Sequence, residues 1–256
     1  MSKMLNIMEY FYSIQGEGSR AGKPSVFIRL SGCNFTCAGF GVQYETPEGQ
    51  KKVGCDSFYS VDTKFKDRWN KYVWTDLVTR VEEIIPQSNT NKKVDIVITG
   101  GEPLIWWNNK DFQNMISYYV SRGHKVTIET NASIGINFTK EYQKEILFSM
   151  SVKLSNSGET KARRIKIPNI SGIIQNCPSS YLKFVVDKDS KDVILEEIEE
   201  ILSLIPHYAT VYLMPMGDTI ETLSYNAEEV INICMEKKFN YSDRLHIRIW
   251  NNKEGV

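Results

Sequence analysis

The chain has 256 residues, a length that many α/β barrels reach as one domain, and we expect a single domain over residues 1–256. Hydrophobic residues make up 41% of the chain and aromatic residues 11%, which excludes a disordered protein. The 31 basic and 31 acidic side chains cancel, so the charge favours neither nucleic acid nor a membrane surface as a partner, and a small-molecule substrate fits better. The N-terminal sequence lacks the apolar core of a signal peptide, and no run approaches the roughly 20 apolar residues of a membrane span. We therefore expect a soluble, cytoplasmic protein.

Short β-branched runs alternate with helix-like segments along most of the chain, which is typical of repeated βα units around a parallel sheet. The predicted strands are residues 25–30, 94–99, 125–130, 147–152, 182–186, 210–214 and 245–249. Apolar residues at helical spacing predict helices over 75–85, 111–120, 191–205 and 227–238. About six strands are too few for a full eight-unit barrel, so we predict an α/β fold, a partial, open TIM-like barrel of parallel strands with outer helices.

The five cysteines are not expected to form disulfides, because the cytoplasm is reducing and the odd number would leave one unpaired. Cys177 and Cys234 stand apart and are predicted to be small buried residues. Cys33, Cys37 and Cys55 lie close together in the sequence, and three thiolates supply three of the four ligands of a 4Fe-4S cluster, leaving one iron open. A structural zinc site would need a fourth ligand nearby, yet the nearest histidine lies 69 positions after the third cysteine.

The sequence TGGEP occupies residues 99–103, at the expected end of a strand. Glycines at this place let the backbone approach a ligand closely, and exposed amides and carbonyls there can bind the amino group of a cofactor. Paired glycines are also common in turns. Together with the upstream cysteines, however, the motif favours a cofactor site.

With these motifs in view, the sequence resembles the 7-carboxy-7-deazaguanine synthases, radical S-adenosylmethionine enzymes of deazapurine (queuosine-type) biosynthesis. The resemblance runs nearly end to end, and QGEG followed by FIRLSGCN is its most specific part because it exceeds what the superfamily shares. It is carried by FYSIQGEG (11–18), GKPSVFIRLSGCNFTC (22–37), CDS (55–57), TGGEP (99–103), IETN (128–131), SVK (151–153), LKFVV (182–186), LMPM (213–216) and RLHIRIWNN (244–252).

The resemblance implies a binding site for a pterin that carries a carboxylate. The implied contacts are Ile14, Gln15, Gly16, Arg29 and Thr99, with His246 and the terminal Val256 closing the site. Arg29 suits this role, because a guanidinium pairs with a carboxylate through two parallel hydrogen bonds. It also alternates with Phe27 and Ser31 on one face of a strand that leads into Cys33.

The resemblance further implies a magnesium ion and S-adenosylmethionine. Ser57 holds the position of the Mg²⁺ ligand. Asp56 beside it is a candidate to accept hydrogen bonds from the groups that bind this ion. The implied contacts to S-adenosylmethionine are Gly101, Glu129, Ser151, Val152, Lys153, Met214, Pro215, Met216 and Gly217. Val152 stands where the family usually has proline, and Met214 where glutamine is commoner.

The largest departure from the family pattern is the interval 38–54, which puts 17 residues between Cys37 and Cys55 where the simplest superfamily pattern has two. This cluster-loop insertion is predicted to form a hairpin about TPEG. It bears on how an electron donor approaches the cluster, and the resemblance implies an unidentified flavodoxin-like donor as well as a homodimer.

The resemblance implies that a 5′-deoxyadenosyl radical takes a hydrogen atom from 6-carboxy-5,6,7,8-tetrahydropterin, whose ring then contracts with loss of ammonia to 7-carboxy-7-deazaguanine. No side chain is predicted to be catalytic, because the cluster and the cofactor carry the chemistry. Two alternatives stay open. One is a radical activase that installs a glycyl radical on a partner enzyme, and the other is a non-enzymatic binding module that uses the three cysteines as a metal staple.

Overall fold

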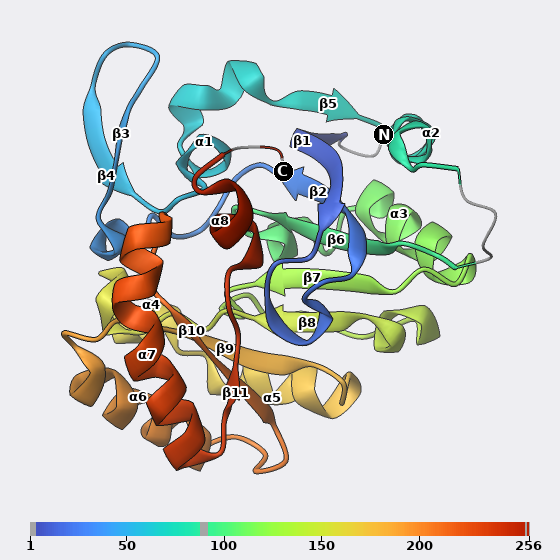
Figure 1. Ribbon diagram of the computed structural model, residues 1–256. Helices are drawn as coiled ribbons and strands as arrows, with labels where there is room; N and C mark the ends of the chain where they lie inside the picture. Colours follow the sequence, from blue (N-terminus) through green and yellow to red (C-terminus); the bar gives the residue numbers. More distant parts are fainter. Residues whose placement is uncertain (1–3, 88–91, 254, 256) are drawn as a thin grey trace.

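The protein is described by a computed structural model that covers residues 4–87, 92–253 and 255. Its centre is a nine-stranded sheet within these residues (Figure 1). In sheet order the strands are β11 (Asn240–Tyr241), β10 (Thr210–Pro215), β9 (Tyr181–Val186), β8 (Leu147–Met150), β7 (Val126–Thr130), β6 (Asp95–Gly100), β2 (Pro24–Leu30), β1 (Leu5–Ile14) and β5 (Asn70–Tyr72). The strands from β2 to β11 pair in parallel, while β1 and β5 extend the sheet in antiparallel pairing.

The parallel part confirms the predicted open barrel of about six strands. Its strands are apolar on both faces, as in the buried Ile96, Val97 and Ile98 of β6, which is typical of parallel strands in α/β proteins. Six of the seven predicted strands end within two residues of the observed bounds. β1 was not predicted, since one of its faces is only half-buried and its apolar pattern is correspondingly mixed.

Five longer helices accompany the sheet, and the apolar stripes of the four predicted ones face the core. They are α2 (Trp74–Ile84), α3 (Lys110–Ser121), α5 (Ile167–Asn176), α6 (Lys191–Ser203) and α7 (Ile220–Lys237). α7 begins seven residues before its predicted start at 227, at the cap residue Thr219. α5 was missed because Pro168 and Gly172 resemble helix breakers, although proline is tolerated in the first turn.

The shorter helices lie in connections and at the C-terminal end. They are α1 (Phe58–Val61), α4 (Lys161–Arg164) and α8 (Leu245–Trp250), with the 3-10 turns η1 (Gly18–Arg20), η2 (Ala38–Phe40), η3 (Thr63–Arg68), η4 (Pro103–Trp106), η5 (Glu141–Glu145) and η6 (Ser155–Ser157). No helix among the residues covered is long and apolar enough to cross a membrane.

The strand predicted over 245–249 is wrong, because these residues form the helix α8. The alternating β-branched residues Ile247 and Ile249 suggested a strand, yet only Ile247 is buried and the segment does not join the sheet. Its first amide, that of Leu245, donates to the carbonyl of Gly16 at 3.0 Å instead. Tertiary contact therefore overrides local β propensity here.

The insertion forms the predicted hairpin, with β3 (Val42–Glu45) antiparallel to β4 (Lys51–Gly54). Its turn is closed by Thr46, whose hydroxyl accepts from the amide of Gln50 at 3.1 Å. Figure 1 shows the hairpin projecting from the sheet as a separate two-stranded ribbon.

Candidate functional site

A cavity of about 620 Å³ opens at the carboxyl ends of the parallel strands, the end at which barrels of this type carry their sites. Most of the predicted site residues line it. They are Gln15, Arg29, Cys33, Cys37, Cys55, Ser57, Thr99, Gly101, Glu129, Ser151, Lys153, Met214, Pro215, Met216, Gly217 and His246. The structure therefore brings together side chains from both halves of the sequence.

Four predicted residues are not among those that line the cavity. Ile14 is half-buried at the end of β1, and Val152 is buried in the core at 1% exposure. Gly16 lies beneath His246, where an added β-carbon would come within 2.2 Å of the ring Nδ1. Val256 lies outside the described residues.

The three cysteines reach the cavity from a loop that follows β2 and from the end of the hairpin. Cys37 has a left-handed backbone, with φ 50° and ψ 44°, and the amide of Phe35 donates to Cys33 Sγ at 3.4 Å. Burial raises the pKa of Cys33 and of Cys55 to about 12, and it also raises the pKa of Cys37. The free thiols are consequently protonated, and a metal that binds them must displace the protons.

These thiols suit an iron–sulfur cluster because thiolates are the usual ligands of such clusters and because all three cysteines line the same cavity. Within the described part of the chain, no three His, Cys, Asp or Glu side chains are arranged to hold a single metal ion. A cluster does not require that arrangement, because each thiolate binds a different iron atom. The amide of Phe35 donates a hydrogen bond to Cys33 Sγ, and hydrogen bonds of this kind tune the reduction potential of such a cluster.

The glycines of TGGEP are required by close packing of protein against protein. A β-carbon on Gly100, which has φ 135°, would lie 2.0 Å from the carbonyl oxygen of Leu30, and one on Gly101 would lie 2.2 Å from that of Gly32. The motif therefore presses the end of β6 against the start of the cysteine loop. Close packing of the backbone is therefore sufficient to explain these two glycines, without the cofactor contact that the sequence suggested.

Glu102 of the same motif was not singled out from the sequence, yet it is fully buried. Its carboxylate accepts from the Thr130 hydroxyl at 2.7 Å and from the amides of Asn131 at 2.7 Å and Leu104 at 2.9 Å. Burial outweighs these bonds and raises the pKa of the Glu102 carboxyl. Glu102 thus ties the ends of β6 and β7 together beneath the cavity.

Glu129 is bonded to two residues of the predicted pterin set. Its Oε1 accepts from the Gln15 amide at 3.1 Å and its Oε2 from the Thr99 hydroxyl at 2.8 Å. The sequence reading assigned Glu129 to S-adenosylmethionine and the other two to the substrate. In the structure the three side chains form one hydrogen-bonded group at the ends of β1, β6 and β7, which joins Glu129 to the predicted substrate set.

Arg29 faces the cavity together with Phe27, whereas Ser31, the third residue of the predicted face, is buried. The Arg29 Nε donates to Glu9 Oε1 at 2.7 Å, and its Nη1 donates to Ser57 Oγ at 3.4 Å. Arg29 thus lies at the cavity beside the predicted magnesium ligand.

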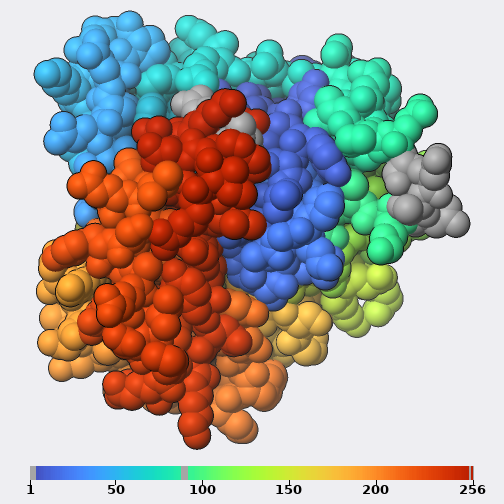
Figure 2. Space-filling view, viewed as in Figure 1, coloured from blue at the N-terminus to red at the C-terminus, as the bar shows by residue number. Residues whose placement is uncertain are grey.

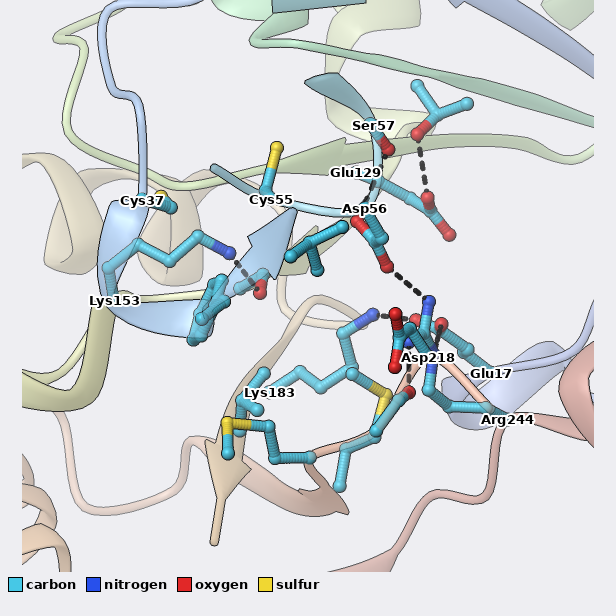
Figure 3. Close-up of a pocket in the computed structure, with 18 of the residues that line it drawn as sticks. Glu17, Cys37, Cys55, Asp56, Ser57, Glu129, Lys153, Lys183, Asp218 and Arg244 are labelled. Carbon is cyan, nitrogen blue, oxygen red and sulfur yellow. Dashed lines mark hydrogen bonds and ion pairs between the residues drawn. The ribbon is translucent and has the colours of Figure 1, made fainter. Parts of the chain in front are cut away.

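Ser57 and Asp56 present oxygen atoms at the same wall, with Ser57 Oγ donating to Asp56 Oδ1 at 3.4 Å (Figure 3). Neutral hydroxyl and carboxylate oxygens are suitable ligands for Mg²⁺. Asp56 Oδ2 is already engaged, because Arg244 Nη2 donates to it at 2.6 Å. The donor set is compatible with a hard cation that completes its shell with water or substrate oxygens.

A network of buried charges next to Asp56 was missed from the sequence. Glu17 forms ion pairs with Lys183 and with Arg244, whose Nε lies 3.1 Å from Glu17 Oε1 (Figure 3). Burial opposes ionisation, but the two cations outweigh it and hold the pKa of the Glu17 carboxyl far below its usual value. The available signal was Lys183, a single charge within the apolar strand LKFVV.

The segments predicted to bind S-adenosylmethionine, residues 151–153 and 214–217, contribute to another part of the cavity wall. Lys153 Nζ donates to Ser151 Oγ at 3.0 Å, and Arg244 Nη1 donates to the carbonyl of Gly217 at 2.5 Å. Asn226 on α7 donates to the carbonyl of Met216 at 2.8 Å, which orients the segment after β10. On the face shown in Figure 2 the C-terminal residues lie directly against the N-terminal strands, in agreement with the bond between Leu245 and Gly16.

Comparisons with known proteins identify the family to which the chain belongs. Residues 14–172 match the model of the 4Fe-4S single cluster domain, so the chain is an iron–sulfur protein built on an open α/β barrel. The chain is 32% identical to the 7-carboxy-7-deazaguanine synthase of Halobacterium salinarum, over 96% of this chain and 91% of that one. It is 30% identical to the enzyme of the same name from Rhodopirellula baltica, over 98% and 89%.

The chain therefore belongs to the 7-carboxy-7-deazaguanine synthase family. The crystal structure of QueE from Escherichia coli superposes with a TM-score of 0.60 at 21% identity and covers 94% of both chains. That likeness concerns the fold, and it agrees with the open barrel.

Proposed function

We propose that this protein is a 7-carboxy-7-deazaguanine synthase, which converts 6-carboxy-5,6,7,8-tetrahydropterin to 7-carboxy-7-deazaguanine and ammonia. The observation that carries the proposal is the common cavity of the three cysteine thiols and the Arg29 guanidinium. A cluster held by Cys33, Cys37 and Cys55, together with S-adenosylmethionine, supplies the radical chemistry when bound. The chain supplies binding, orientation and exclusion of water.

The substrate is held from the side of β1, β2 and β6. Arg29 binds its carboxylate, and the linked Gln15, Thr99 and Glu129 supply hydrogen bonds to its polar edge. Ile14 and Gly16 contribute through the backbone, and His246 with Val256 closes the site. Ser57 would hold a Mg²⁺ ion, which would supply positive charge to the same carboxylate.

S-adenosylmethionine is held from the side of β8 to β10. Ser151, Lys153 and the backbone of Gly101 contact it, and Val152 serves through its backbone because its side chain is buried. The adenine side is bound by Met214, Pro215, Met216 and Gly217. Glu129 stands between the two ligands and contacts the ribose hydroxyls as well as the substrate.

We further propose one domain over residues 1–256 with an insertion at 38–54, a homodimer, and reduction by a flavodoxin-like donor that approaches near the hairpin. A cytoplasmic location fits this chemistry, because free thiols and a reduced cluster require a reducing compartment.

Anaerobic turnover tests the proposal. Reconstituted protein is supplied with the pterin, S-adenosylmethionine, Mg²⁺ and a chemical reductant, and the product and ammonia are measured by mass spectrometry and an enzymatic ammonia assay. We expect product formation that requires S-adenosylmethionine. A fully loaded protein that cleaves S-adenosylmethionine but leaves the pterin unchanged contradicts the assignment, and a radical on an added partner enzyme would point to an activase instead.

A further inference from the structure

The loop that carries Cys33 and Cys37 is held from outside the cavity by one carboxylate. Glu159 Oε1 accepts from the amide of Thr36 at 2.8 Å, from the amide of Cys37 at 3.2 Å and from the Thr36 hydroxyl at 3.3 Å. A single oxygen thus receives three hydrogen bonds from the loop, one of them from a predicted cluster ligand itself. Burial opposes ionisation of Glu159, but the hydrogen bonds from Thr36 and Cys37 together with the charge of Arg163 lower the pKa of its carboxyl.

The second oxygen of the same carboxylate is engaged as well. Arg163, one helical turn further on, lies with Nη1 2.8 Å from Glu159 Oε2. Its Nη2 donates to the carbonyl of Asn34 at 2.5 Å, and its guanidinium lies 5.4 Å from the centre of the Phe35 ring. Glu159 and Arg163 therefore contact the loop at both of its ends.

The backbone around Glu159 is itself firmly placed. The Ser157 hydroxyl accepts from the amide of Glu159 at 3.3 Å, and the buried Arg164 donates to the carbonyl of Glu159 at 3.2 Å. Gly39, just after the loop, packs so tightly on this segment that a β-carbon there would lie 2.3 Å from the carbonyl oxygen of Asn156. The carboxylate thus projects from a rigid support rather than from a mobile loop.

Such support has a purpose at Cys37, because its left-handed backbone is one that residues with a β-carbon rarely adopt. Such a conformation persists only where the surrounding structure holds it in place. We propose that Glu159, held by Arg163, is a positioning residue for the iron–sulfur cluster, which keeps residues 34–37 in the ligating conformation before iron binds. The inference rests on the proposed ligation of the cluster by the three cysteines.

Iron release tests this directly. Wild-type protein and variants are reconstituted anaerobically, iron and sulfide per chain are measured, and the rate of iron transfer to a coloured chelator is followed. We expect Glu159→Ala to release iron about 10-fold faster or more, the typical effect of removing a group that orients a metal ligand. Glu159→Gln keeps the accepting Oε1 and is expected to restore a rate within about threefold of wild type.

Two further variants complete the set. Glu200→Gln removes a carboxylate whose pair with Lys161 is exposed, and it should release iron at the wild-type rate. Arg163→Ala, whose side chain is 57% exposed, is expected to fold and to release iron about threefold faster, so it provides the test if Glu159→Ala does not fold. Circular dichroism of the metal-free proteins monitors folding.

Electron paramagnetic resonance of the reduced cluster measures its g-values, which a general loss of protein stability does not change. Glu159→Ala should alter the g-values, with and without S-adenosylmethionine, while Glu200→Gln should not. Wild-type release rates and spectra in both Glu159→Ala and Arg163→Ala would overturn the inference, and so would a Glu159→Gln rate equal to that of Glu159→Ala. A wild-type chain that loads no cluster would instead count against the proposed function.

Discussion

Arg244 donates from Nη2 to Asp56 Oδ2 at 2.6 Å across 188 positions of the sequence. The bond joins the C-terminal segment to the residue that follows the third cysteine. The same guanidinium contacts Glu17 and the carbonyl of Gly217, so one side chain connects four segments around the cavity. Arg244 thus links the segments around the cavity although it has no proposed contact to any ligand.

Replacing Arg244 should therefore lower the stability of the metal-free chain. Arg244→Met leaves the largely buried carboxylate of Glu17 with one cation instead of two, and we expect the free energy of unfolding to fall by about 3 kcal/mol. Urea denaturation followed by circular dichroism at pH 7.5 measures this change.

Arg248→Met, four residues further on in α8, is the matched control. Arg248 pairs with Asp243 at 3.2 Å in a partly exposed position, and such pairs contribute less than about 1 kcal/mol. Equal losses in the two variants would show that Arg244 has no special role.

The sequence predicted the parallel strands because strands buried on both faces require continuous apolar runs, which are easily recognised. It failed at α8, where Ile247 and Ile249 alternate like a strand but the backbone bonds to Gly16. The cysteines were found because their spacing is local. The pair of Glu17 with Lys183 spans 166 positions, and only the folded sheet brings such residues together.

The cysteine assignment predicts a sharp division among the five thiols. Cys33→Ala, Cys37→Ala and Cys55→Ala should each fail to retain a full cluster, because each removes one of three protein ligands. Cys177→Ala and Cys234→Ala should keep wild-type iron and sulfide, since these buried thiols do not line the cavity and instead donate to the carbonyls of Gln143 and Asn240. The measurement is iron and sulfide per chain with the visible spectrum. Normal loading of any of the first three would remove that residue from the ligand set.

His246 should make stability fall as the pH drops below neutrality. Burial lowers the pKa of its ring below the usual 6.5, although Glu17 acts in the opposite sense. The unfolded chain then binds a proton that the folded chain does not, so stability is present above pH 6.5 and is lost progressively as the pH falls below that value. The depressed pKa of Glu17 adds a further loss below about pH 4.5, the usual range of a glutamate carboxyl.

Urea denaturation of the metal-free chain between pH 7.5 and 5 measures this dependence. His246→Gln should flatten the slope relative to wild type. An unchanged slope in His246→Gln would mean that the ring does not lose its proton on folding.

Two glycine-to-alanine substitutions distinguish a steric clash with the backbone, expected at Gly101, from the lower backbone entropy of the unfolded chain, expected at Gly172. In Gly101→Ala the new β-carbon would lie 2.2 Å from the carbonyl oxygen of Gly32, which is backbone and has little room to move because the amide of Glu102 donates to it at 2.9 Å. We expect a loss of about 1–3 kcal/mol in the free energy of unfolding and faster iron release, since the displaced carbonyl directly precedes Cys33. Gly172→Ala lies in α5 with nothing within 4 Å of the new atom and should gain about 0.5–1 kcal/mol. If Gly101→Ala were as stable as Gly172→Ala and held iron as well as wild type, the contact between β6 and the cysteine loop would have no part in holding the cluster.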